Sequence, residues 1–398
     1  MINQLFTKHI KAINGLKTRF RSNFHDKIQW NERLVGIKGA RGVGKTTFIL
    51  QHIHETFGLS RDCLYVSLDD IAFPYENLVQ LAEEFEKSGG KYLFLDEIHK
   101  YVNWSQELKN IYDSFTDLHV VFTGSSILDI LKGKADLSRR AVVYRMQGLS
   151  FREFLQIETE KPFQQFTLDE LLQNHEQLAL EINQKVKPFQ YFDKYLRYGY
   201  YPYYLENIEN YTFKLSNTIS LMIETDLPLL SNVDIQYLGK IKKFLNLLSS
   251  NIPFKPNVTN LAAGIGISWQ SVINYLHYLD EAEIIKTIYF EGKDIKSLSK
   301  PEMIYLHHPN HFYVFNDEVV NKGSLRESFF VNQLSNKYKV EKAKRGDFVV
   351  NEKFYFEIGG KNKTYHQIAG IQNSYIAADD IEYGFNNKIP LWLFGFLY

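Results

Sequence analysis

The chain has 398 residues, 44% hydrophobic and 15% aromatic, which is enough to build sizeable cores in about two to four domains. Lys plus Arg and Asp plus Glu both number 46, so bulk charge gives no reason to expect nucleic acid or an acidic membrane as a partner. A single cysteine, Cys63, excludes an internal disulfide and fits a reducing cytoplasm, and we see neither an apolar signal core nor a membrane-spanning run of about 18 apolar residues.

The first 30 residues predict an amphipathic helix. Apolar side chains recur at helical spacing, with basic side chains between or after them: Ile2, Leu5, Phe6, Ile10 and Ile13, then Lys8, Lys11, Lys17, Arg19 and Arg21. We expect this helix to pack on the core ahead of the first strand. A surface helix that binds a membrane or a partner is the alternative.

A phosphate-binding loop comes next. It reads Gly39, Ala40, Arg41, Gly42, Val43, Gly44, Lys45, Thr46 and Thr47, and it matches G-x-x-x-x-G-K-S/T at every fixed position. The apolar run Leu34–Lys38 precedes the loop and a helical pattern follows it, so backbone N–H groups and the positive end of a helix would face an anion. We therefore expect ATP as ligand, with Lys45 on its β- and γ-phosphates and Thr46 on Mg²⁺. A chance glycine-rich turn is the alternative.

Five short apolar runs alternate with helical patterns in this part of the chain. They are Leu34–Lys38, Cys63–Ser67, Tyr92–Asp96, His119–Thr123 and Ala141–Met146. The alternation predicts an α/β fold, a parallel sheet with helices on both faces. Ligands of such sheets bind at the carboxyl ends of the strands.

Two of these strand ends carry candidate site residues. The third run ends in Asp96 and Glu97, and a buried strand tolerates a charge only where it emerges into a site. We expect Asp96 to hold Mg²⁺ and Glu97 to orient and deprotonate the attacking water. The fourth run ends in hydroxyls, and Ser125 is expected to sense the γ-phosphate; an ordinary helix cap explains the same cluster equally well.

An arginine pair, Arg139 and Arg140, stands just before the fifth run. A guanidinium brought to the γ-phosphate stabilises charge in the transition state. A surface arginine pair explains the spacing as well.

The chain resembles prokaryotic AAA+ ATPases of the archaeal-ATPase-like class in the order and spacing of four motifs: the Lys45 loop, Leu95–Glu97, Thr123–Ser126 and Leu137–Arg140. Gln147–Phe154 and Tyr198–Pro202 are similar to further stretches of that family, so the resemblance covers nearly the whole chain. In the family pattern Leu-x-Gly-Arg the arginine falls on Arg140, and Arg139 replaces the usual glycine, which leaves the choice between them open.

The resemblance implies five segments. After the helix at 1–30 come an AAA+ P-loop core at 31–150, a helical lid at 151–245, a winged helix at 246–300 and a domain of unknown function at 301–398. The two expected helices of the winged helix are Val258–Ala263 and Ser268–Asp280. DNA is not the favoured partner, because no Lys or Arg lies between Lys255 and Lys286 to neutralise phosphates; a docking or structural module fits better.

The last domain resembles the restriction-endonuclease-like fold. Glu327, Asp347 and Glu357 form a possible second metal site, but Gly359 stands where that fold places a lysine. Lys361 shares the face of Glu357 and lies further along the strand. Eight basic and four acidic residues between Lys337 and Lys363 give a local charge of +4. An inactive relic used for packing or partner binding is favoured over an active nuclease.

Together these features predict a Mg²⁺-dependent ATPase, in which Lys45, Glu97 and Arg140 are the catalytic side chains. An ATP-driven switch that acts on a protein partner is favoured, as a monomer or an ATP-dependent homo-oligomer. The alternatives are a DNA-processing ATPase whose C-terminal domain cuts, and a nucleotide-binding scaffold with negligible turnover. Intact Glu97 favours the first two over the scaffold.

Overall fold

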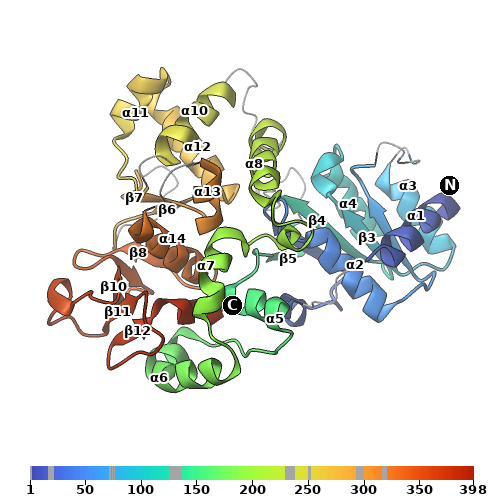
Figure 1. Ribbon diagram of the computed structural model, residues 1–398. Helices are drawn as coiled ribbons and strands as arrows, with labels where there is room; N and C mark the ends of the chain where they lie inside the picture. Colours follow the sequence, from blue (N-terminus) through green and yellow to red (C-terminus); the bar gives the residue numbers. More distant parts are fainter. Residues whose placement is uncertain are drawn as a thin grey trace. The chain divides into compact units, whose positions relative to one another are not determined.

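The computed structural model describes residues 2–16, 22–70, 73, 75, 77–125, 137–228, 238–249, 252–292, 300–315 and 321–398. The chain forms two compact units, residues 1–147 and residues 148–398 (Figure 1). The expected division of the second unit into lid, winged helix and C-terminal domain stays a prediction. Within the ranges given above, no helix is long and apolar enough to cross a membrane.

The first unit is built on a five-stranded parallel sheet in the order β2-β3-β4-β1-β5. Its strands are β1 (Leu34–Gly39), β2 (Cys63–Ser67), β3 (Tyr92–Asp96), β4 (His119–Ser125) and β5 (Val142–Arg145). All five predicted strands are confirmed. Runs of buried Val, Leu, Ile and Phe in β1 to β4 suit strands covered on both faces, whereas β5, at the edge of the sheet, is only partly buried. The α/β fold of P-loop NTPases is therefore confirmed.

The helical segments that accompany this sheet in the described residues are α1 (Ile2–Asn14), η1 (Asn23–Lys27), α2 (Lys45–Thr56), α3 (Leu78–Lys87), η2 (Ile98–Lys100) and α4 (Trp104–Ser114). Helix α1 buries Leu5, Phe6 and Ile13 and contacts β2 and α2. The predicted amphipathic helix thus packs on the core, as the favoured interpretation had it. Helices α3 and α4 contact each other.

The second unit begins with helices and ends in a mixed sheet. Its helical segments are α5 (Phe151–Thr159), α6 (Leu168–Lys185), α7 (Phe189–Tyr198), η3 (Pro202–Leu205), α8 (Tyr211–Leu221), η4 (Met222–Asp226), α10 (Leu238–Ser249), α11 (Val258–Ile265), α12 (Trp269–Glu281), η6 (Pro309–His311), α13 (Phe312–Phe315), α14 (Lys322–Ser335), η7 (Tyr365–Gln367) and η8 (Leu391–Phe396). The two helices predicted from Val258 and Ser268 are α11 and α12. Ser268 caps α12 by accepting a hydrogen bond from the N–H of Ser271.

The described part of this unit contains two sheets. Strands β6 (Ile285–Ile288) and β7 (Met303–Leu306) pair antiparallel. The larger sheet runs in the order β12-β11-β10-β9-β8 and contains β8 (Val340–Lys342), β9 (Phe348–Val350), β10 (Phe354–Gly359), β11 (Ser374–Ala378) and β12 (Lys388–Pro390). Strands β10, β11 and β12 are parallel, whereas β9 is antiparallel to β10 and β8.

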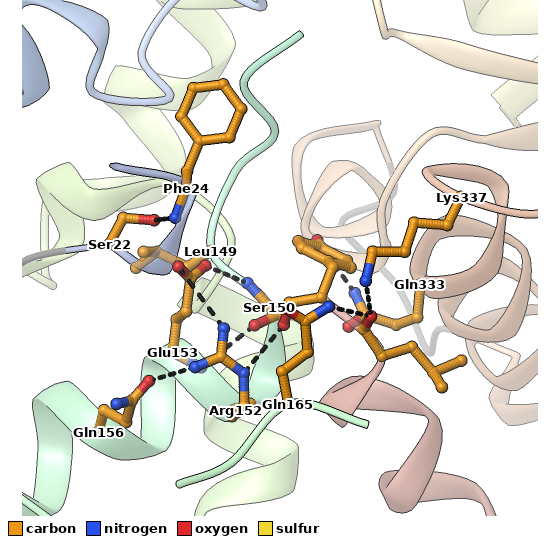
Figure 2. A network of polar contacts seen from close by, with 12 residues as sticks. Ser22, Phe24, Leu149, Ser150, Arg152, Glu153, Gln156, Gln165, Gln333 and Lys337 are labelled. Carbon is orange, nitrogen blue, oxygen red and sulfur yellow. Dashed lines mark hydrogen bonds and ion pairs between the residues drawn. The ribbon is translucent and has the colours of Figure 1, made fainter. Parts of the chain in front are cut away.

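A buried polar network ties α5 to the last residues of the sequence (Figure 2). Arg152 is 1% exposed; its Nε donates to the backbone oxygen of Tyr398 (3.1 Å) and its Nη1 to Gln156 (2.6 Å). Lys337 of α14 and Gln165 both donate to the backbone oxygen of Leu397, at 2.8 and 2.7 Å. A buried guanidinium is tolerated only with such partners, so α5 and the C-terminal segment depend on one another.

The stretch around Tyr200, part of the family resemblance, has a structural role. Asn310 accepts hydrogen bonds from the N–H of Tyr200 (3.0 Å) and the hydroxyl of Tyr211 (2.6 Å). A Cβ on Gly199 would lie 2.8 Å from the Cα of Tyr195. Close approach of backbone therefore requires glycine here, and the stretch fastens the α7–α8 region to the segment at Asn310.

Candidate functional site

The phosphate-binding loop joins β1 to α2. Gly42 and Gly44 have φ angles of 87° and 99°, a left-handed conformation that favours glycine. A Cβ on Gly39 would overlap the backbone oxygen of Met146. The predicted glycines are thus required by backbone geometry, and helix α2 begins directly behind them at Lys45.

Lys45 is 5% exposed and lies back on its own loop. Its Nζ donates to the backbone oxygens of Gly39 (2.9 Å) and Ala40 (3.0 Å). Both partners are uncharged carbonyl groups, so they do not neutralise the positive charge of the Lys45 ammonium group. That charge remains available to a bound anion. The first turn of α2 adds backbone N–H groups and the positive end of the helix dipole. Lys45 and the loop therefore fit the triphosphate of a nucleotide.

Asp96 is the last residue of β3 and is 2% exposed. One carboxylate oxygen, Oδ2, accepts from the hydroxyls of Thr46 (2.7 Å) and Tyr65 (2.9 Å), and the other accepts from the hydroxyl of Thr123. The structure thus brings together Thr46 and Asp96, which the sequence predicted as a Mg²⁺ pair. Hydroxyl donors stabilise the carboxylate and leave its negative charge in place. An oxygen donor set of this kind is the one that Mg²⁺ prefers.

Tyr65 and Thr123 were missed as partners of Asp96. Burial and the charge of Asp96 raise the pKa of Tyr65, so its hydroxyl stays a donor. The order of the strands is the signal that could have predicted these contacts. Strands β2 and β4 flank β3, so hydroxyls near their carboxyl ends lie beside Asp96. Thr123 belonged to the hydroxyl cluster assigned to phosphate sensing, and in the structure it binds the carboxylate instead.

Glu97 turns sharply out of the end of β3. Its φ of 56° is uncommon for a residue with a side chain, and its N–H donates to the hydroxyl of Thr123 (3.0 Å). Its side chain is 22% exposed, and Oε2 lies 3.4 Å from Nε2 of His99. The turn therefore places a partly open carboxylate next to the Asp96 group, where the predicted water-orienting role requires it.

Ser125 is the last residue of β4 and is 3% exposed. Its N–H donates to Nδ1 of His99 at 3.4 Å. Its predicted role as a γ-phosphate sensor stays a prediction. The competing helix-cap interpretation concerns residues from 126 onward, which lie outside the described residues.

Arg140 does not belong to this edge of the sheet. Val142 pairs with Val35 of the parallel strand β1, so Arg140 is level with the start of β1. Six strand residues at about 3.3 Å each separate that level from Gly39, a distance of about 20 Å. Its Nε and Nη2 donate to the two carboxylate oxygens of Asp113, at 2.8 and 3.0 Å. Arg140 therefore lies far from the loop of its own chain, because a residue that precedes a parallel strand lies at the opposite edge from one that follows it. Its predicted catalytic role stays a prediction.

A second group of charges lies at β10 in the other unit. Glu357 is fully buried, and Nζ of Lys363 lies 2.5 Å from its Oε1. A Cβ on Gly359 would meet Cδ of Lys363 at 2.7 Å, so the methylene chain of Lys363 crosses the space that this glycine leaves open. The amine beside the acid thus comes from Lys363, which the sequence analysis did not consider beside Lys361.

The other two predicted acids have partners of their own. Glu327 accepts from the hydroxyl of Tyr305 (2.8 Å), and Asp347 accepts from the N–H of Ile358 (2.8 Å). Burial and the charge of Asp347 raise the pKa of Glu327. In the part of the chain that the structure describes, no three His, Cys, Asp or Glu side chains are grouped so that they could hold a metal ion. The second metal site stays a prediction.

Comparisons with known families agree with the first site. A family model described as AAA domain matches residues 31–155, and one described as Domain of unknown function (DUF8612) matches residues 189–300. Two uncharacterised proteins of Methanocaldococcus jannaschii are similar to the chain. One is 29% identical over 70% of this chain and 62% of its own length; the other is 26% identical over 83% of this chain and 73% of its own length. The chain thus spans less than two thirds of the first relative.

Solved structures with low similarity include AMPPCP-bound DnaA from Aquifex aeolicus, 17% identical over 70% of this chain and 88% of that one, with a TM-score of 0.25. Another is a signal transduction ATPase with numerous domains from Pyrococcus horikoshii, which carries a tetratricopeptide repeat sensor. It is 14% identical over 80% of this chain and 46% of that one, with a TM-score of 0.26. The AAA domain match over residues 31–155 agrees with the P-loop NTPase fold that the parallel sheet and its loop show.

Proposed function

We propose that this protein binds and hydrolyses ATP with Mg²⁺. The observation that carries the proposal is the hydrogen bond of 2.7 Å between the hydroxyl of Thr46 and Asp96, behind a loop whose lysine rests on neutral carbonyls. Lys45 and the loop N–H groups bind the phosphates. Thr46 and Asp96 hold the metal, which neutralises phosphate charge when bound. Glu97 orients a water in line with the γ-phosphate and accepts its proton.

Binding is tested with Lys45→Ala. This change removes the loop cation, and we expect calorimetry to detect no ATP binding. An unchanged ATP affinity contradicts the assignment of the loop.

Chemistry is tested with Glu97→Gln, which keeps the shape of the side chain and loses the base. This variant should bind ATP normally while turnover falls on the order of 100-fold or more. Phosphate release at the wild-type rate assigns the base to another residue.

Hydrolysis is proposed to drive a switch that acts on a protein partner, and Arg140 is proposed to act in trans. Its position far from the loop of its own chain supports a role at a neighbouring copy, after release from Asp113. Activity per chain should then rise with protein concentration. Mixing Arg140→Ala with Lys45→Ala protein should restore part of the activity. A monomer with full activity in ATP, measured by light scattering, excludes this role.

A metal-dependent nuclease is the second candidate, favoured by one observation: Lys363 brings its amine to Glu357, the acid beside which a hydrolytic lysine is needed. The protein is incubated with plasmid, linear and single-stranded DNA in Mg²⁺ or Mn²⁺, with and without ATP. Cleavage that is lost in Lys363→Ala and kept in Lys361→Ala supports the nuclease. No cleavage by the wild type leaves the acid cluster as a structural or partner-binding element.

A further inference from the structure

One buried histidine lies beside the proposed base. His99 belongs to η2, directly after Glu97 and Ile98, and its side chain is 1% exposed. The imidazole stands between two groups. Its Nδ1 accepts the N–H of Ser125 at 3.4 Å, and its Nε2 lies 3.4 Å from Oε2 of Glu97. The ring therefore links the end of β4 to the carboxylate that follows β3.

The chemistry of these contacts fixes the position of the ring proton. A backbone N–H only donates, so Nδ1 must carry the lone pair and not the proton. Burial, helped by the cations Lys100, Lys45 and Arg41, lowers the pKa of His99 to about 3, and the ring is neutral at physiological pH. A neutral imidazole has one proton. That proton is on Nε2, on the side that faces Glu97.

A general base works only when its acceptor oxygen is held in line with the water. The Glu97 side chain is 22% exposed, and solvent exposure by itself leaves several rotamers accessible. A donor that fixes Oε2 leaves Oε1 for the water. The neutral ring does this without giving up a proton, so Glu97 stays a base. At 3.4 Å Nε2 faces Oε2 without meeting hydrogen-bond geometry in this structure. Hydrogen bonds of catalytic groups are often long or poorly aligned in apo proteins and tighten when substrate binds.

We propose that His99 is a positioning residue for ATP hydrolysis: its Nε2–H orients Oε2 of Glu97, and its Nδ1 anchors that orientation to the backbone of Ser125. This inference rests on the proposed function, because it assigns His99 to the base of that reaction. Ser125 then contributes through its backbone N–H as well as through any contact of its hydroxyl with phosphate.

Two substitutions of His99 test the roles of Nδ1 and Nε2 separately. The amide nitrogen of His99→Gln reaches the position of Nε2 and keeps a donor for Glu97. The shorter side chain of His99→Asn reaches only the position of Nδ1, so it keeps an acceptor for Ser125 and loses the donor. We expect kcat to fall on the order of 10-fold or more in His99→Asn and by less than about 3-fold in His99→Gln. KM and the calorimetric ATP affinity should stay within about 3-fold of wild type in both, because both substitutions leave the loop residues that bind phosphate unchanged.

A double variant tests whether His99 acts through Glu97. Glu97→Gln with His99→Asn should be no slower than Glu97→Gln alone, because the carboxylate to be positioned is already gone. Additive losses overturn the inference, as does a wild-type kcat in His99→Asn or an equal loss in both single variants. Should His99→Asn not fold, a 10-fold loss in His99→Gln with normal ATP affinity also overturns it. A wild type that binds ATP and releases no phosphate overturns the proposed hydrolysis itself, and the inference with it.

Discussion

Strands β1 and β10 both end in a glycine, and at each the missing Cβ leaves space for a neighbouring group. A different group occupies that space at each strand end. At Gly39 the neighbour is the backbone oxygen of Met146; at Gly359 it is the side chain of Lys363. Lys45, behind the first glycine, contacts carbonyls, whereas Lys363 contacts the carboxylate of Glu357. A lysine on carbonyls keeps its charge for a ligand. A lysine on a buried carboxylate is already neutralised, so the first strand end is the one prepared for an anion.

The acids of the two sites differ in the same way. Asp96 is surrounded by three hydroxyl donors, from Thr46, Tyr65 and Thr123, which stabilise its charge without cancelling it. Glu357 is in direct contact with a cation, the ammonium of Lys363. A metal ion is attracted to a carboxylate that is still charged and is opposed by a lysine in its place. The carboxylate of Asp96 can therefore still attract a cation, whereas the carboxylate of Glu357 is already paired with Lys363.

Substituting alanine for Gly39 and for Gly359 should give the largest effects on stability and turnover, and the two effects should differ. The Cβ of Gly39→Ala meets backbone, which cannot swing aside, so we expect a loss of about 3 kcal/mol or more in stability. Turnover should fall on the order of 100-fold, since a shift of about 1 Å in catalytic geometry has that effect. The Cβ of Gly359→Ala meets a flexible side chain and should cost about 1 to 2 kcal/mol without a change in turnover.

Urea unfolding and phosphate release measure both variants. Gly239→Ala, in helix α10 with no atom within 4 Å of the added Cβ, is the matched control and should gain about 0.5 to 1 kcal/mol. Normal turnover in Gly39→Ala would show that the Met146 backbone yields, and the distinction between the two strand ends would then be lost.

Removal of the cation should have the next largest effect. Lys363→Met removes the cation that contacts the buried Glu357, and we expect a loss of about 2 to 3 kcal/mol, the low end for a buried pair because the Lys363 side chain is 30% exposed. Lys361→Met is the matched control and should change stability by less than about 0.5 kcal/mol. ATP turnover should not change in either. Glu357→Gln combined with Lys363→Met should recover part of the loss, and failure to recover would mean that Lys363 stabilises the domain through its methylenes.

The penalty in Lys363→Met should depend on pH. Burial raises the pKa of Glu357, and loss of the lysine that opposes this shift raises it further. A raised pKa in the folded state means that the folded protein holds the proton to higher pH than the unfolded chain does. Its contribution to stability is present at low pH and is lost as pH rises through the folded pKa. The penalty should therefore shrink from about 3 kcal/mol near pH 7.5 to about 1 kcal/mol near pH 5, and a pH-independent penalty would contradict a charge origin.

The sequence predicted the features that depend on order along the chain. Apolar runs located the five strands of the first sheet, and the loop motif located Lys45 and Thr46. It did not predict contacts that depend on which strands are neighbours, such as Tyr65 with Asp96. It missed Lys363 because the chain turns back after β10, with the N–H of Lys363 bound to the oxygen of Gly360, so that spacing along an extended strand no longer applies. The position of Arg140 before a parallel strand already predicts its edge of the sheet, opposite to the loop of its own chain.

The smallest predicted effect concerns Tyr65. Tyr65→Phe removes one of three hydroxyl donors to Asp96, and the remaining two, from Thr46 and Thr123, keep the carboxylate bonded. We therefore expect a stability loss of only about 1 kcal/mol by urea unfolding and turnover within about 3-fold of wild type. Thr123→Val is the contrasting variant, since this hydroxyl also accepts the N–H of Glu97, and its turnover should fall more than that of Tyr65→Phe. If Tyr65→Phe loses as much stability as Lys363→Met, then Asp96 also depends on one dominant partner. The contrast between a carboxylate shared among neutral donors and one in direct contact with a cation would then not hold.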